Sequence, residues 1–303
     1  MSDERLEAVI ASVPALAGRV RATEEITGGL INRSVKVATT DASYVVRLFT
    51  THSELLLIDR DNEAGNSELA ARSGVGAGVI AYLPEHQAMV LEFIEGVPQS
   101  DADLCRGEKP RMVARTLREL HSGPAFGRDF DMFDVQRRYL AIVDAQGFRI
   151  PDRYPLYLPH AARMEAAIRA TDDGKRPCHN DLMPGNFIDV GGRLRLIDYE
   201  YSGNNDPCFD LGGIWAEAGM SLAQLETMVA EYYGEPRPDR VARARLWAVM
   251  WSYGWTLWAA IQVGEGMQYE DFDAWTWAEA HLDRVETMLG GSELDHLLAE
   301  LGA

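Results

Sequence analysis

The first third of the chain alternates apolar and polar positions in short runs that are typical of β-strands. Three runs rich in β-branched residues are separated by glycine or Asp/Asn turns, at 20–26, 34–39 and 43–49. A helical pattern follows at 59–74, where Asp59 or Asp61 can cap the start and Gly74 can end the helix. Two more strands are expected within 78–96. This order predicts a small antiparallel sheet with one helix.

Beyond about residue 100, apolar positions recur at three- and four-residue intervals, which is typical of amphipathic helices. We expect helices at 108–123, 131–146, 160–170, 221–233, 238–263 and 272–301. One β-hairpin interrupts them at 185–200, with its turn at Gly191 and Gly192. The change in pattern predicts an N-terminal lobe at 1–97 and a C-terminal lobe at 98–303.

The expected helix at 238–263 carries four of the seven tryptophans in the chain. Trp247, Trp251, Trp255 and Trp258 fall on one stripe, within an arc of about 80° on a helix. Polar and small residues interrupt the apolar segment, which is shorter than the roughly 20 residues of a membrane span. We therefore predict no membrane insertion. Two alternatives remain, a packed core or a cage for a cationic ligand, and we expect Trp247 and Trp251 to belong to the core.

The amino-acid composition restricts the kinds of molecule that the protein is expected to bind. The chain has 303 residues, of which 47% are hydrophobic and 25% charged, and its formal net charge is −18. Nucleic acids and anionic membranes need a basic surface, so we exclude them and favour a cationic substrate. Three scattered cysteines form no CxxC pair, and the acidic start lacks the pattern of a signal peptide. These features predict a cytoplasmic protein.

The segment HNDLMPGNFIDVGGRLRLIDYE carries the strongest chemical signal. Asp181 is followed five residues later by Asn186, and Asp198 lies at the end of the predicted hairpin. This spacing matches the layout of phosphoryl-transfer enzymes, in which an aspartate accepts the proton of the acceptor hydroxyl. An amide oxygen and a second carboxylate supply the oxygen ligands that Mg²⁺ prefers. We expect His179 to brace this loop by hydrogen bonding.

These residues resemble the motifs of the aminoglycoside phosphotransferase and choline kinase superfamily, with the greatest similarity to choline/ethanolamine kinases. HNDLMPGN is similar to the catalytic loop, and LIDYEYSGNNDPCFDLG to the metal segment. The resemblance implies an α+β, protein-kinase-like, two-lobed fold. Its N-lobe is a small antiparallel sheet with one helix, and its larger C-lobe is mainly helical. It also implies ATP and Mg²⁺ as cofactors and a bracing role for Asp210.

The N-terminal lobe then supplies the nucleotide site. TGGLINRSVKV looks like the loop over the phosphates, where Gly28 and Gly29 permit close backbone approach. Asn32 and Ser34 would add polar contacts to the same phosphates.

Arg47 stands where protein kinases have lysine, and choline kinases resemble this sequence in using arginine there. A guanidinium can bind phosphate in bidentate fashion. Glu63 would be its ion-pair partner, with Glu68 as the alternative. Backbone groups near Glu92 and Ile94 would contact adenine.

The resemblance also implies a site for a cationic head group. A quaternary ammonium donates no hydrogen bonds, and proteins hold it with aromatic faces and a carboxylate. The positions that match the family pattern are Tyr201, Glu217, Trp255, Trp258 and Trp275. Trp275 stands where those enzymes have a tyrosine.

We therefore predict an ATP- and Mg²⁺-dependent kinase acting on the hydroxyl of a small amino alcohol, choline first and ethanolamine second. The alternatives are an aminoglycoside phosphotransferase or another small-molecule hydroxyl kinase. A non-catalytic, nucleotide-binding pseudokinase is the alternative from another class. The expected partners are ATP and a small cationic substrate with a hydroxyl. The oligomeric state stays open, with a homodimer among the alternatives.

Overall fold

An antiparallel sheet and two helices form the N-terminal part of the molecule. The computed structural model describes residues 2–27, 29, 31–50, 55–171, 174–269 and 272–302. The sheet has the order β1-β2-β3-β5-β4, with strands β1 (Val20–Ile26), β2 (Arg33–Thr39), β3 (Ser43–Leu48), β4 (Val79–Leu83) and β5 (Ala88–Glu92). Each neighbouring pair is antiparallel. The predicted strands are confirmed.

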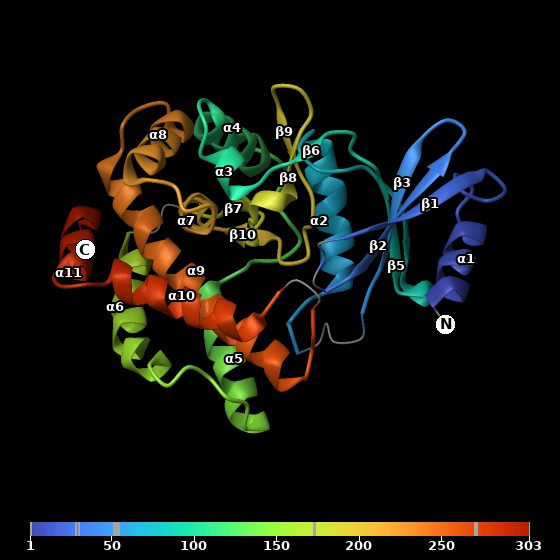
Figure 1. Ribbon diagram of the computed structural model, residues 1–303. Helices are drawn as coiled ribbons and strands as arrows, with labels where there is room; N and C mark the ends of the chain where they lie inside the picture. The colour runs from blue at the N-terminus through green and yellow to red at the C-terminus, as the bar shows by residue number, and fades with distance from the viewer. Residues whose placement is uncertain are drawn as a thin grey trace.

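Two helices accompany this sheet. Helix α1 (Ser2–Ser12) packs apolar residues on the sheet, and α2 (Arg60–Arg72) lies between the sheet and the helical remainder (Figure 1). Asp59 caps α2, because its side chain accepts a hydrogen bond from the backbone N–H of Asn62. Of the two caps that the sequence allows, the structure uses Asp59.

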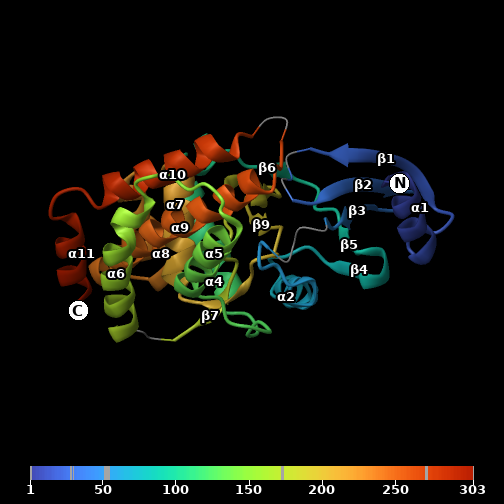
Figure 2. The ribbon, with the colours of Figure 1, turned by 90° about the horizontal axis from the view of Figure 1, so that it is seen from below.

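The remainder is mainly helical, as expected. Its helices are α3 (Asp101–Leu104), α4 (Lys109–His121), α5 (Met132–Gln146), α6 (Leu158–Ala170), α7 (Pro207–Glu217), α8 (Leu222–Tyr233), α9 (Pro238–Gly264), α10 (Ala274–Met288) and α11 (Glu293–Leu301). The expectation of one helix over 272–301 is wrong. The chain breaks between α10 and α11, where Gly291 takes a left-handed φ of 63°. Helix α11 lies at the end of the molecule opposite the sheet (Figures 1 and 2).

Short strands lie between the helices of the helical part. They are β6 (Val97–Pro98), β7 (Arg176–Cys178), β8 (Phe187–Asp189), β9 (Leu194–Leu196) and β10 (Gly203–Asn205). Strands β8 and β9 form the predicted hairpin, and the side chain of Asp189 accepts hydrogen bonds from the backbone N–H groups of Gly191 and Gly192. The sequence did not predict β6, which pairs with β8, or β7 and β10, which pair with each other.

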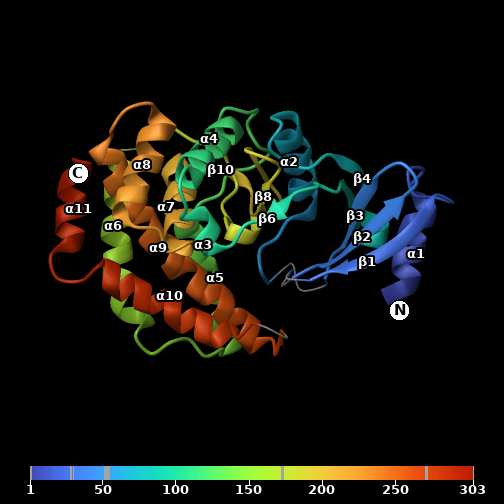
Figure 3. The same cartoon turned by 45° about the horizontal axis from the view of Figure 1, so that its top comes forward.

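The centre of the helical part is α9, which lies beside α5, α7 and α10 (Figure 3). Trp247 and Trp251 are 4% and 1% exposed and lie against Phe209, at ring-centroid distances of 5.3 and 5.2 Å. The prediction that these two indoles belong to the core is confirmed. Within the described part of the chain, no helix has the length and hydropathy needed to cross a membrane.

Two adjacent glycines allow α7 to approach α9 closely. A Cβ atom at Gly212 would lie 2.0 Å from the carbonyl oxygen of Ala244, and one at Gly213 would lie 2.3 Å from the Trp251 ring. Real Cβ atoms do not come this near to other heavy atoms, so any larger residue must push the two helices apart.

We expect Gly212→Ala to lower the free energy of unfolding by about 3 kcal/mol, because the new methyl group meets rigid backbone rather than a mobile side chain. Urea unfolding measures the change. Gly65→Ala in α2 is the matched control, since a Cβ there meets nothing within 4 Å and alanine favours a helix by about 1 kcal/mol. Equal unfolding midpoints for Gly212→Ala and the unmodified chain would contradict the close helix contact.

Candidate active site

A buried carboxylate holds the loop that begins at His179. Asp210 lies in the first turn of α7 and is fully buried. One of its oxygens accepts a hydrogen bond from the backbone N–H of Asn180 at 2.8 Å, and the other from the N–H of His179 at 2.8 Å. The second oxygen is also 2.9 Å from the Nε2 atom of His121. The predicted bracing role of Asp210 is confirmed.

The side chain of His179 continues this bracing. Its Nε2 atom lies 2.9 Å from the carbonyl oxygen of Ile197, and its Nδ1 atom lies 3.3 Å from the backbone nitrogen of Asp181. Burial lowers the pKa of His179, so the ring is neutral, and these contacts fit the tautomer with the proton on Nε2. His179 therefore ties the catalytic loop to the segment before Asp198, as predicted.

Asp181 lies near other carboxylates. Burial, followed by the charges of Asp198, Glu200 and Glu217, raises the pKa of Asp181 well above its usual range, while Arg47 opposes the shift. A general base must be able to hold the proton that it accepts, so a raised pKa suits that role.

The two predicted metal ligands lie on either side of the hairpin. Asn186 donates its Nδ2–H to the carbonyl oxygen of Asp181 at 3.1 Å, which turns the amide and leaves its oxygen for another contact. Asp198 follows β9 with a left-handed φ of 74°, which is uncommon for aspartate and re-aims the chain.

Arg47 connects the sheet to this acidic segment. Its guanidinium lies 3.3 Å from Glu63, 2.5 Å from Asp198 and 2.9 Å from Glu200. Burial disfavours its charge, but these three carboxylates outweigh burial and raise the pKa of Arg47. Of the two partners that the sequence allowed, the structure pairs Arg47 with Glu63; Glu68 instead lies near Arg72 on the surface.

Oxygen atoms from Glu63, Asp198 and Glu200 lie within 4.8 Å of one another. Hard oxygen donors of this kind fit Mg²⁺ and do not fit a metal that prefers sulfur or imidazole. The residues present therefore fit the cation that the sequence motif implies.

Sequence reasoning missed two members of this network, Arg60 and Glu200. Arg60 Nη1 donates to Glu63 at 2.6 Å and to Glu200 at 3.1 Å, and its Nη2 donates to Asn32 at 3.0 Å. Two sequence signals were available. Arg60 precedes Glu63 by three residues on a helix, and Glu200 follows Asp198 by two residues.

The phosphate-loop residues lie beside this network. Asn32 donates to Glu200 at 2.9 Å, and Ser34 pairs with Arg47 across β2 and β3. Gly29 is exposed, and a Cβ there would lie 3.1 Å from the carbonyl oxygen of Asn32. Gly28 lies outside the described residues.

The expected adenine segment follows β5. The side chain of Glu92 pairs with Arg195 and accepts a hydrogen bond from the backbone N–H of Gly78, and the backbone N–H of Glu92 donates to the carbonyl oxygen of Gly78. Ile94 is buried in an apolar cluster with Ala77 and Ile188. This cluster joins the sheet to the β8–β9 hairpin and offers an apolar surface at the junction.

Aromatic rings join the acidic segment to α9. Tyr201 lies edge-on to Trp255, with ring centroids 4.8 Å apart. Trp255 and Trp258 are 3% and 7% exposed, and their indole N–H groups have no hydrogen-bond partner among the described residues. Trp258 lies near Phe272 and Trp277, at 6.5 and 5.8 Å. Tyr201 and Trp255 thus form one group of rings, and Trp258, Phe272 and Trp277 form a second; both belong to the same apolar core, and we call the two groups together the aromatic cluster.

Trp275 does not occupy the position that the family pattern implies. The guanidinium of Arg149 lies 3.9 Å from its ring centroid. Trp275 and Trp277 are two residues apart on α10 and therefore face different directions. Trp277 is the indole of α10 that contacts Trp258.

Glu217, at the end of α7, is held by side chains of α10. Its carboxylate lies 3.0 Å from Nη1 of Arg284 and 3.5 Å from Nε2 of His281. Burial favours the neutral acid, but these contacts outweigh it and lower the pKa of Glu217 below its usual range. Burial also lowers the pKa of His281, so Arg284 is the cation that compensates Glu217.

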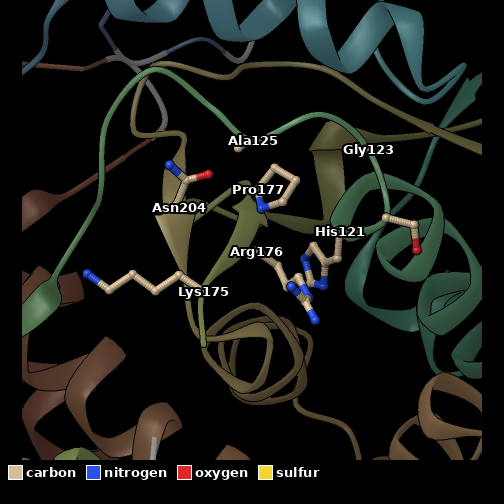
Figure 4. A pocket seen from close by; sticks show the side chains of 8 residues that line it. His121, Gly123, Ala125, Lys175, Arg176, Pro177 and Asn204 are labelled. Atoms are coloured by element: carbon tan, nitrogen blue, oxygen red, sulfur yellow. The ribbon is translucent and has the colours of Figure 1, made fainter. Parts of the chain in front are cut away.

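A separate hollow of about 350 Å³ lies beside β7 (Figure 4). Its lining includes His121, Lys175, Arg176 and Asn204, and none of the predicted site residues belongs to it. Since His121 also contacts Asp210, this hollow adjoins the brace of the catalytic loop rather than the aspartate itself.

Comparisons with known proteins agree with this geometry. A family model described as the phosphotransferase enzyme family matches residues 22–247. Protein LicA of Haemophilus influenzae is 26% identical over 256 residues, which cover 81% of this chain and 75% of that protein. A choline/ethanolamine kinase family protein from Mesorhizobium loti has a TM-score of 0.86 at 28% identity, covering 99% of both chains. Choline kinase LicA from Streptococcus pneumoniae has a TM-score of 0.79 at 25% identity, covering 94% of this chain and 99% of that one. The expected fold class is confirmed.

The Glu217–Arg284 ion pair makes a prediction about stability. Glu217→Gln should lower the free energy of unfolding at pH 7 by about 2 kcal/mol. This loss is smaller than that expected on breaking a fully buried ion pair, because Arg284 is 27% exposed. A carboxylate with a lowered pKa stabilises the fold above its unfolded pKa, and this contribution is lost on acidification. The difference from the unmodified chain should therefore shrink as the pH falls below about 4.5.

Urea unfolding at a series of pH values measures this difference, with the exposed Glu235→Gln as the control. A difference that stays constant down to pH 3 would contradict the assignment of an ionised, paired Glu217.

Proposed function

The chain belongs to the phosphotransferase enzyme family and is a small-molecule kinase, and from this premise we propose its substrates. The donor is ATP, and the acceptor is the hydroxyl of a small amino alcohol, choline first and ethanolamine second. One observation carries this proposal. Tyr201, three residues beyond Asp198, lies 4.8 Å from Trp255, so the aromatic cluster begins where the catalytic segment ends.

The chemistry follows from the residues around Asp181. The hydroxyl oxygen forms a bond to the γ-phosphorus, the bond from that phosphorus to ADP breaks, and the hydroxyl proton passes to the Asp181 carboxylate. The Asp210 and His179 contacts fix the loop before the substrate arrives, so little reorganisation is needed at that moment.

Asn186 and Asp198 would hold Mg²⁺, and Glu200 lies close enough to Asp198 to join them. When bound, this ion masks the negative charge of the ATP phosphates. Arg47 offers a guanidinium to the same phosphates, and Glu63 holds it from α2.

The nucleotide would then lie under the sheet. Asn32 and Ser34 border the phosphates, and the backbone near Glu92 and Ile94 borders the adenine. The lobes proposed at 1–97 and 98–303 would thus bind donor and acceptor respectively.

The head group is recognised by Tyr201, Trp255, Trp258 and Glu217, which we call the head-group cage. A cation over an aromatic ring gains about 0.5–2 kcal/mol per contact. The charge of Glu217 contributes to the raised pKa of Asp181, which supports one crevice for the hydroxyl end and the charged end. Two similar structures are those of a choline/ethanolamine kinase family protein and a choline kinase, which is consistent with this choice.

A coupled assay of ADP release tests the proposal directly. Choline, ethanolamine, thiamine, homoserine and a panel of aminoglycosides are compared as acceptors. We expect turnover of choline above all others. Turnover confined to aminoglycosides would contradict the acceptor class, and nucleotide binding without any turnover would favour a pseudokinase.

Asp181→Asn tests the proposed base. The amide cannot accept the proton, so kcat should fall by about 10²–10⁴-fold. ATP affinity, measured by isothermal titration calorimetry, should stay within about twofold, because Asp181 serves the acceptor and not the nucleotide. Asp152→Asn changes an exposed aspartate and should keep kcat unchanged. A variant at 181 with near-normal kcat would exclude the residue as the base.

Trp255→Ala and Trp258→Ala test the cage. Each should raise the KM for choline by about 5- to 30-fold, equivalent to the loss of 1–2 kcal/mol of cation–π attraction. The control is Trp215→Ala, since that indole donates its N–H to Ser221 on the surface. If choline KM is the same in all three variants, the indoles of α9 serve only the core.

A further inference from the structure

Glu217 is an unusual carboxylate for a cation-binding site, because it already has a cationic partner on one of its oxygens. Arg284 takes Oε2, and His281 lies next to Oε1. The side chains of Glu217 and His281 are 6% and 1% exposed, so water adds little to this arrangement. Glu217 and Arg284 together carry no net charge.

These contacts lie in the wall of the head-group cage. The ring of His281 lies tilted against Trp277, at a centroid distance of 3.6 Å, and the Trp277 ring lies 5.8 Å from that of Trp258. Helices α7 and α10, which carry the ion pair, both contact α9, which carries the indoles (Figure 3). Any change at Arg284 therefore reaches the cage through Glu217.

The head groups of amino alcohols differ in the hydrogen-bond acceptors that they require from this wall. A primary ammonium donates three hydrogen bonds and needs acceptor atoms once it leaves water. A quaternary ammonium donates none and is satisfied by aromatic faces. A carboxylate that is already paired with Arg284 offers a primary ammonium less charge and one fewer acceptor site, while the rings of Tyr201, Trp255 and Trp258 are unaffected.

We propose that Arg284 determines the head-group preference of this enzyme, favouring quaternary over primary ammonium because it occupies the carboxylate of Glu217. The inference rests on the proposed function, since it concerns the choice among amino alcohols. Arg284 acts through Glu217 and is a specificity-determining residue rather than a catalytic one.

The first measurement uses the unmodified protein. Ethanolamine, its N-methyl and N,N-dimethyl derivatives and choline are compared as acceptors in the ADP-release assay. We expect kcat/KM to rise with methylation, by about tenfold or more over the series. A preference for ethanolamine over choline would overturn the role of Arg284 and leave the proposed amino alcohol kinase intact. Failure to turn over any of the four would contradict the proposed function itself.

The second measurement uses Arg284→Gln. Removing the guanidinium frees Oε2 for a primary ammonium, so the ratio of kcat/KM for choline to that for ethanolamine should fall about tenfold, mainly through a lower KM for ethanolamine. Arg284→Lys keeps a charged donor and should hold the ratio within about threefold. Arg149→Gln is the matched control, since Arg149 stacks on Trp275 and touches no cage residue among its described contacts.

An unchanged ratio in Arg284→Gln, or an equal loss for both acceptors, would show that Arg284 only supports the fold and would overturn the proposal. If Arg284→Gln does not fold, the methylation series in the unmodified protein still decides the question.

Discussion

The geometry of the active site depends on the hydrogen bonds that the buried carboxylate of Asp210 accepts from the catalytic loop. An unpaired charge in that position would be strongly destabilising, so the two backbone N–H groups of the catalytic loop and the ring of His121 must stay in place. Seven residues later, the same helix carries Glu217. Helix α7 therefore fixes the catalytic loop and Glu217, the two ends of the proposed acceptor site, relative to each other. Gly212 and Gly213 let this helix lie directly against the tryptophan helix.

Ion pairs, besides the small apolar cluster around Ile94, connect the sheet to this assembly. The core between α1 and the sheet is separate from the large apolar cluster of the helical part. Between them, Arg47 and Arg60 bind Glu63, Asp198 and Glu200. Such a network is specific in geometry, and the ATP and Mg²⁺ that we propose to bind here would alter the charges that it must balance.

Local signals in the sequence predicted much of this structure. Asp181, Asn186 and Asp198 are joined by one loop and one hairpin, so their spacing in the sequence was enough to group them. The cap of α2 involves only residues that lie within three positions of one another. Contacts that depend on tertiary packing were harder to predict from the sequence. Trp275 and Trp277 differ only in the face of α10 that they occupy, and the rotation of a helix is decided by its neighbours. Strands β6, β7 and β10 are two or three residues long, too short for a periodic pattern. Arg60 and Arg284 look like ordinary surface arginines until their partners are brought close.

The central claim is that Asp181 and the indoles of α9 line one crevice that holds a hydroxylated ammonium. The most direct test is a crystal structure with ADP and choline. We predict that the quaternary nitrogen lies over the rings of Tyr201 and Trp255, while the hydroxyl oxygen lies within hydrogen-bond distance of the Asp181 carboxylate, about 2.6–3.2 Å. Choline bound elsewhere, or rings that stay in a dry core with no ligand between them and Asp181, would contradict it.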